Sequence, residues 1–110
     1  MTEYKLQISP EAQKDLQEIK TYISEDLSSP QAANNTVAKI LNSIKNLKQM
    51  PNVGTRLSSK FDIETDYRFL ACGTYLAFYR CENKTVFIDR IIYGRRDYIK
   101  ILFQSNNDEE

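Results

Sequence analysis

Two apolar stripes with helical spacing constrain the fold of this chain more than any other feature of its sequence. Each stripe follows a serine–proline pair, Ser9-Pro10 or Ser29-Pro30, which suits the capped first turn of a helix. Met50-Pro51 ends the second stripe, because the residue before proline is disfavoured in helical geometry. The stripes consist of Ala12, Leu16, Ile19 and Ile23, and of Ala33, Val37, Ile40, Leu41, Ile44 and Leu47. The short turn between them predicts an antiparallel helical hairpin, whose apolar side needs a second layer to cover it.

That second layer is predicted to be a sheet. Residues 3–8, 67–72, 75–81 and 85–93 alternate or are rich in aromatic and β-branched residues, and short turn sequences separate the last three segments. We therefore expect an α+β fold, with an N-terminal strand and a helical hairpin packed on one face of a three- to four-stranded antiparallel sheet. Four residues are expected in the core: Ile40, Ile44, Phe78 and Ile88.

Strict alternation along residues 85–93 predicts which side chains share a face. It places Val86, Ile88, Arg90 and Ile92 on one face, and Phe87, Asp89, Ile91 and Tyr93 on the other. An arginine on the first, mostly apolar face is expected at a rim or paired with a carboxylate. Arg80, close to Glu82, is interpreted as structural in the same way.

Residues 1–103 are predicted to form a single domain, and the polar, acidic residues 104–110 a disordered tail. Residues 51–66 are predicted to form a loop of unusual length, a kind of segment that often carries function.

Cys72 and Cys81 are interpreted as buried small hydrophobes of a reducing compartment. The chain starts without signal-peptide features and has no apolar run long enough to span a bilayer, so we expect a cytoplasmic protein without membrane contact.

Several enzyme classes are excluded by composition. The 110 residues include no histidine, and no glycine-rich phosphate loop, nucleophile elbow or HExxH motif is present. We therefore expect no metal and no cofactor. The formal net charge is zero, yet residues 27–61 contain no acidic residue and five basic ones. This asymmetry indicates either a charged macromolecular partner or an ordinary solvated helix face.

Arg95-Arg96 is the strongest candidate binding site in the sequence. The two cations follow Gly94 at the end of a predicted strand, where they repel each other unless an anion or an acidic partner is present.

Together with the predicted element order, four segments make the chain resemble the toxins of the RelE/ParE superfamily, which belong to bacterial type II toxin–antitoxin pairs. The resemblance covers about residues 3–103 in the same element order. It rests on the segments 8–12, 50–54, 67–80 and 93–97. It implies a microbial RNase-like fold and a growth inhibitor that forms an oligomer with a cognate antitoxin, whose disordered end wraps the toxin.

The resemblance leaves three functions open. RelE-like toxins cleave messenger RNA in the ribosomal A site with a basic cluster and a tyrosine, for which Arg68, Arg95, Arg96 and Tyr98 are the candidates. ParE-like toxins inhibit DNA gyrase and are not nucleases. Leu76 stands where the nuclease needs a cation, which favours the ParE-like branch, with Arg95, Arg96 and Tyr98 as target-binding residues. The third possibility is a non-toxic module that only binds antitoxin.

Overall fold

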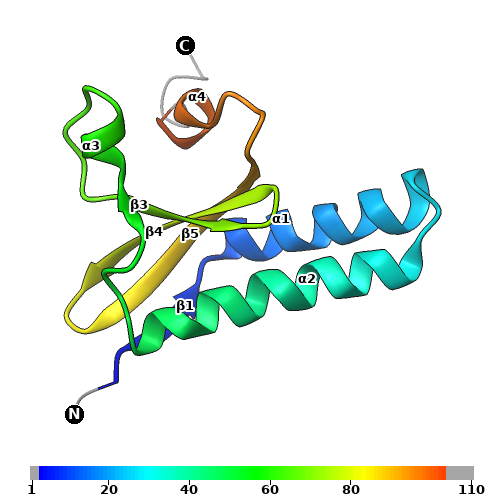
Figure 1. Cartoon of the computed structure of the whole chain (residues 1–110), viewed down its shortest axis with the longest axis horizontal. Helices are drawn as coiled ribbons and strands as arrows, with labels where there is room; N and C mark the ends of the chain where they lie inside the picture. The colour runs from blue at the N-terminus through cyan, green and yellow to red at the C-terminus, as the bar shows by residue number, and fades with distance from the viewer. Residues whose placement is uncertain (1–2, 104–110) are drawn as a thin grey trace.

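The computed structural model describes residues 3–103, so the tail predicted to be disordered lies outside the described residues. Two layers of helix enclose a sheet (Figure 1). The helices are α1 (Pro10–Thr21), η1 (Tyr22–Asp26), α2 (Pro30–Lys45), η2 (Asn46–Lys48), α3 (Leu57–Lys60) and α4 (Tyr98–Phe103). The strands are β1 (Lys5–Ile8), β2 (Thr55–Arg56), β3 (Arg68–Cys72), β4 (Tyr75–Glu82) and β5 (Thr85–Tyr93).

The helical hairpin forms as the stripes predict. The Ser9 Oγ accepts a hydrogen bond of 2.9 Å from the Ala12 N–H, and the Ser29 Oγ accepts one of 3.4 Å from the Ala32 N–H. Both serines thereby satisfy backbone donors that a helix leaves free at its start. The π-helical turn η1 extends α1 before the chain reverses at Ser28, whose φ is 53°.

The sheet is mixed, so the expectation of an entirely antiparallel sheet is wrong at one edge. Its strand order is β1-β5-β4-β3-β2, and β1 pairs in parallel with β5, with Leu6 opposite Val86. Adjacent parallel strands require a long crossover connection, which the hairpin and the intervening strands supply. The loop predicted over residues 51–66 also contains two short elements, β2 and α3.

A β-bulge in β5 overturns the strict alternation expected there. Phe78 of β4 pairs with Arg90, but the next residue of β4 pairs with Ile88, so Asp89 is an extra residue. A bulge shifts the side-chain alternation by one position. Ile91 therefore joins Ile88 in the core beneath the hairpin, while Ile92 packs on the opposite face.

Both faces of the sheet carry a core, whereas the sequence predicted cover on one face only. The hairpin core includes Ile40, Ile44 and Ile88, which are fully buried as predicted. Phe78 is also fully buried, but it lies on the other face, where α4 and the segment around α3 cover it. Figure 1 shows α4 and α3 across the sheet from α1 and α2.

The two cysteines differ in exposure. Cys72 is buried, as expected, and both thiols are free. Cys81 is exposed, which corrects the prediction that both are buried. It is close to the end of β4, beside the turn into β5, and its sulfur lies 3.9 Å from the Pro51 carbonyl oxygen.

Candidate functional site

Arg95 and Arg96 lie in a tight turn that follows β5. The Gly94 N–H donates to the Thr74 carbonyl at 2.8 Å, and a Cβ at residue 94 would lie 3.1 Å from the same oxygen. The Arg96 N–H donates to the Tyr93 carbonyl at 3.0 Å. Both arginine side chains are exposed, and within residues 3–103 their guanidinium groups make no ion pair or hydrogen bond. The turn therefore presents two cations on a backbone held in place by hydrogen bonds.

An open pocket of about 660 Å³ begins beside this turn. It lies between the tip of the hairpin and the β3–β4 turn, and Arg96 and Lys39 contribute the two cations of its lining that have no partner among the described residues. The aromatic residues of the lining are Tyr22, Tyr75 and Tyr93. The rings of Tyr75 and Tyr93 are 5.7 Å apart. Burial raises the pKa of the Tyr75 hydroxyl, and the neighbouring hydroxyls of Tyr22 and Tyr93 raise it further.

An ion pair forms part of the lining of this pocket. The Arg90 Nε and Nη2 atoms donate to the two carboxylate oxygens of Asp15 at 2.8 and 3.0 Å, and the Ile91 N–H donates to the same carboxylate at 2.8 Å. The hydrogen bond to Asp15 raises the pKa of Arg90. The expectation that Arg90 is paired with a carboxylate is confirmed. Asp15 itself was missed, although it lies three residues after Ala12 on the apolar side of the helix, where a charge needs a partner.

Arg68 is engaged with the loop that follows the hairpin. Its Nη1 atom donates to the Gly54 carbonyl at 2.9 Å and to the Asn52 carbonyl at 3.3 Å. The buried Tyr79 hydroxyl donates to the Pro51 carbonyl and accepts from the Gly54 N–H, both at 2.9 Å. A Cβ at Gly54 would come within 2.5 Å of that hydroxyl, so glycine is needed here. Arg68 and Tyr79 together fix the loop against the sheet.

Tyr98, the other candidate, packs in the second core. Its ring centroid is 5.3 Å from that of Phe78 and 6.0 Å from that of Phe61. Leu76 and Ile92 belong to the same cluster. The position at which the nuclease needs a cation is therefore part of an apolar contact beneath α4.

The structure separates Arg68 from the arginine turn. Arg68 begins β3, and Cys72 ends it next to the strands that lead to Tyr93. Four residues of strand correspond to roughly 13 Å. Arg68 lies at one end of the sheet, whereas Arg95 and Arg96 follow its other end.

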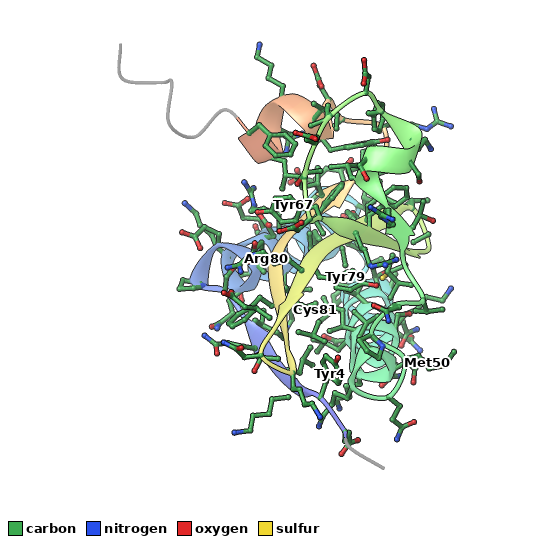
Figure 2. The ribbon with its side chains drawn as sticks, turned by 90° about the vertical axis from the view of Figure 1, so that its left-hand side faces the viewer. Tyr4, Met50, Tyr67, Tyr79, Arg80 and Cys81 are labelled. Carbon is green, nitrogen blue, oxygen red and sulfur yellow. The ribbon has the colours of Figure 1, made fainter. Side chains whose placement is uncertain are left out.

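A polar network lies on the α4 side of the sheet, and the sequence predicted only its Arg80–Glu82 part. The Tyr67 hydroxyl donates to Asp89 Oδ2 at 2.9 Å, and Arg80 Nε donates to the same oxygen at 3.0 Å. Arg80 also pairs with Glu82 at 3.1 Å, so its structural interpretation is confirmed. Figure 2 shows Tyr67 nearer to α4 than Arg80. Burial and the hydrogen bond to Asp89 raise the pKa of Tyr67 to about 12. The bulge that places Asp89 here has no signal in the local sequence.

Within residues 3–103, no three metal-binding side chains lie close enough together to hold an ion. Among the described helices, none has the length and apolar character needed to cross a bilayer.

Comparison with known proteins identifies the family. The family model for the ParE toxin of type II toxin–antitoxin systems (parDE) matches residues 6–98. The chain belongs to the ParE toxin family. No curated protein matches it.

Solved structures of toxin–antitoxin systems resemble this ParE-family chain. The chromosomal ParDE system from P. aeruginosa matches with a TM-score of 0.70 and 26% identity, covering 82% of this chain and 95% of that chain. The RelBE2 toxin–antitoxin complex from Mycobacterium tuberculosis matches with a TM-score of 0.61 and 20% identity, covering 83% and 98%. The archaeal RelE–RelB complex from Pyrococcus horikoshii OT3 gives 0.52 and 21%, covering 87% and 99%. The last two similarities show the shared α+β fold.

Proposed function

We propose that this ParE-family toxin stops growth by binding a protein target such as DNA gyrase, and that it is not an enzyme. The observation that carries the proposal is the exposed Arg95-Arg96 pair on its hydrogen-bonded turn. Exposed guanidinium groups that make no ion pair or hydrogen bond within residues 3–103 are suited to binding carboxylates of a partner. Tyr98 is tied to this turn by its backbone, because its N–H donates to the Arg96 carbonyl at 2.8 Å.

We further propose that a cognate antitoxin neutralises the toxin in the cytoplasm and forms an oligomer with it. The similar solved structures are described as toxin–antitoxin systems or complexes. The acid-free stretch of residues 27–61 supports an acidic antitoxin segment, because a disordered acidic chain can cover a large basic surface when it folds on binding.

Ribosome-dependent cleavage of messenger RNA is the second candidate function, and the extra cation of the Arg95-Arg96 pair favours it. Three features weigh against it. Leu76 supplies no charge, Arg68 is engaged with loop carbonyls, and the Tyr98 ring packs in the second core. Loss of one transition-state donor typically lowers a rate by about 10²- to 10³-fold.

The proposal is tested with the purified toxin in two parallel assays. One measures supercoiling by DNA gyrase, and the other measures messenger RNA cleavage on translating ribosomes. We expect inhibition of supercoiling and no cleavage. Codon-linked cuts would instead support the nuclease, and normal growth after induction without antitoxin would support the non-toxic module.

A further inference from the structure

Half of the large apolar side chains that are exposed within residues 3–103 line the pocket beside Arg96. Six large hydrophobic residues in the described part of the chain are exposed, and three of them line this one pocket. These three are Tyr22, Leu27 and Tyr93, which are 50%, 55% and 39% exposed. Single exposed hydrophobics are ordinary, but a cluster rimmed by polar residues marks an interaction site.

The pocket has the composition of a protein-binding hot spot. Tyrosine and arginine are enriched at the residues that dominate binding energy, and tyrosine orders at low entropic cost. Tyr93 packs against Tyr75, and Ile23 is buried beneath the hairpin tip, so the walls are supported before a partner arrives. A volume of about 660 Å³ is large enough to accept a bulky side chain of a partner.

The charges of the lining favour an acidic partner. Arg90 is neutralised by Asp15, which leaves Lys39 and Arg96 as cations against the single carboxylate of Glu18. The lining therefore carries an excess of one positive charge beside its apolar and aromatic side chains. The complementary group is therefore a bulky apolar side chain with a carboxylate beside it.

We propose that this pocket is where the protein target docks, and that it takes a segment of the target that carries a bulky apolar residue next to an acidic one. The inference rests on the proposed function, because Arg96 belongs both to the pocket and to the arginine turn. A second copy of the chain is disfavoured, since a symmetric contact would bring together two pockets that each carry a net positive charge. The proposed antitoxin surface shares Lys39 with the pocket, but the other four basic residues between 27 and 61 do not line it.

The test uses single and double alanine variants of the exposed pocket tyrosines, Tyr22→Ala and Tyr93→Ala. Met50→Ala and Val53→Ala are matched controls, because these side chains are 57% and 52% exposed and do not line the pocket. Each variant is measured for thermal unfolding, oligomeric state, growth arrest after induction, and affinity for purified gyrase and for the co-expressed antitoxin. We expect each tyrosine variant to weaken gyrase binding at least ~10-fold and to reduce toxicity. Each variant should remain folded at the assay temperature with unchanged oligomeric state and antitoxin affinity, and the controls should match the original protein.

The other possible results distinguish failure of the docking inference from failure of the proposed gyrase-binding function. If the original protein binds gyrase and the tyrosine variants bind it equally well, the docking inference is wrong while the proposed function stands. Loss of antitoxin affinity or of self-association, with gyrase binding intact, assigns the pocket to those partners and also overturns it. If the original protein stops growth without binding gyrase, the gyrase target is wrong. The docking inference then holds only if the tyrosine variants lose toxicity while they still fold and bind antitoxin. A protein without toxicity overturns both.

Discussion

Arg90 donates two hydrogen bonds to the carboxylate of Asp15, which lies 75 residues earlier in the chain. The pair joins α1 to β5, and the same carboxylate also accepts from the Ile91 N–H. Only 8% of Asp15 is exposed, so the contact that fixes the hairpin on the sheet is largely shielded from solvent at its carboxylate.

Replacing Asp15 with alanine should therefore destabilise the protein strongly. The change leaves the Arg90 guanidinium and the Ile91 N–H without their acceptor, and breaking such a pair costs about 2–4 kcal/mol when one partner keeps some solvent contact. Urea unfolding measures the loss. Glu18→Ala, at an exposed position of the same helix, is the matched control and should change stability by less than about 0.5 kcal/mol. Equal unfolding midpoints for the two variants would contradict a role for Asp15 as the anchor of α1.

Truncation in the hairpin core should also be costly. Ile44 is fully buried between α2 and the sheet, and Ile44→Ala should lower the free energy of unfolding by about 2–5 kcal/mol, because the cavity adds to the lost burial. Lys45→Ala, one residue along at an exposed position, serves as the control. If Ile44→Ala lowered the free energy of unfolding by less than about 1 kcal/mol, packing of α2 on the sheet would not depend on this side chain.

Stability should fall in alkali through Tyr67. Its pKa is about 12 in the folded protein and 10.0 in the unfolded chain, so between these values the unfolded chain releases a proton that the folded protein retains. The stabilisation by the neutral hydroxyl is complete below pH 10 and is lost as pH rises towards 12. Since solvent screens the partly exposed group, the expected loss is about 1–2 kcal/mol.

Tyr67→Phe checks this through urea unfolding between pH 9 and 12. The variant should be less stable than the original protein at pH 9, and the difference should shrink as pH rises. Tyr4→Phe removes a hydroxyl that makes no hydrogen bond to another side chain within residues 3–103, and it should leave the profile unchanged. A difference between Tyr67→Phe and the original protein that stays constant over this range would refute the linkage.

The two candidate functions respond differently to changes at the arginine turn. In a gyrase-binding toxin, Arg95→Ala and Arg96→Ala should each weaken target binding by about tenfold or more, whereas Tyr98→Phe should have little effect because its ring contacts remain. In a nuclease, Tyr98→Phe would remove a proton donor and lower cleavage by about 10²- to 10⁴-fold. Supercoiling and ribosomal cleavage assays on the same preparations separate the two, and Arg56→Ala is an exposed control outside the turn.

Elements that depend on nearby residues could be predicted from the sequence. The serine caps, the stripes of the hairpin and the turns between β3, β4 and β5 are set within a few positions of the chain. The bulge at Asp89 and the parallel pairing of β1 could not be predicted, because they follow from how distant segments meet. Alternation alone therefore misplaced Ile91 and Ile92.

The candidate site was accessible to sequence reasoning only in part. Arg95-Arg96 stood out because two like charges followed a glycine at a strand end. The pocket beside them is made of residues from both ends of the chain, such as Tyr22 and Tyr93, whose proximity depends on the packing of the hairpin tip against β5. Likewise, the length of the loop after the hairpin was visible, but its fixation by Arg68 was not.

The parallel pairing of β1 with β5 also bears on synthesis of the toxin at the ribosome. β1 is synthesised first, but its pairing partner β5 is synthesised after the other strands. Asp15 of α1 must likewise wait for Arg90 of β5 before their ion pair can form. Such long-range closure delays cooperative folding until the C-terminal part of the nascent chain has emerged. An unfinished polypeptide thus lacks both the edge pairing and the arginine turn, so the proposed binding surface is complete only after residues 3–103 have been translated.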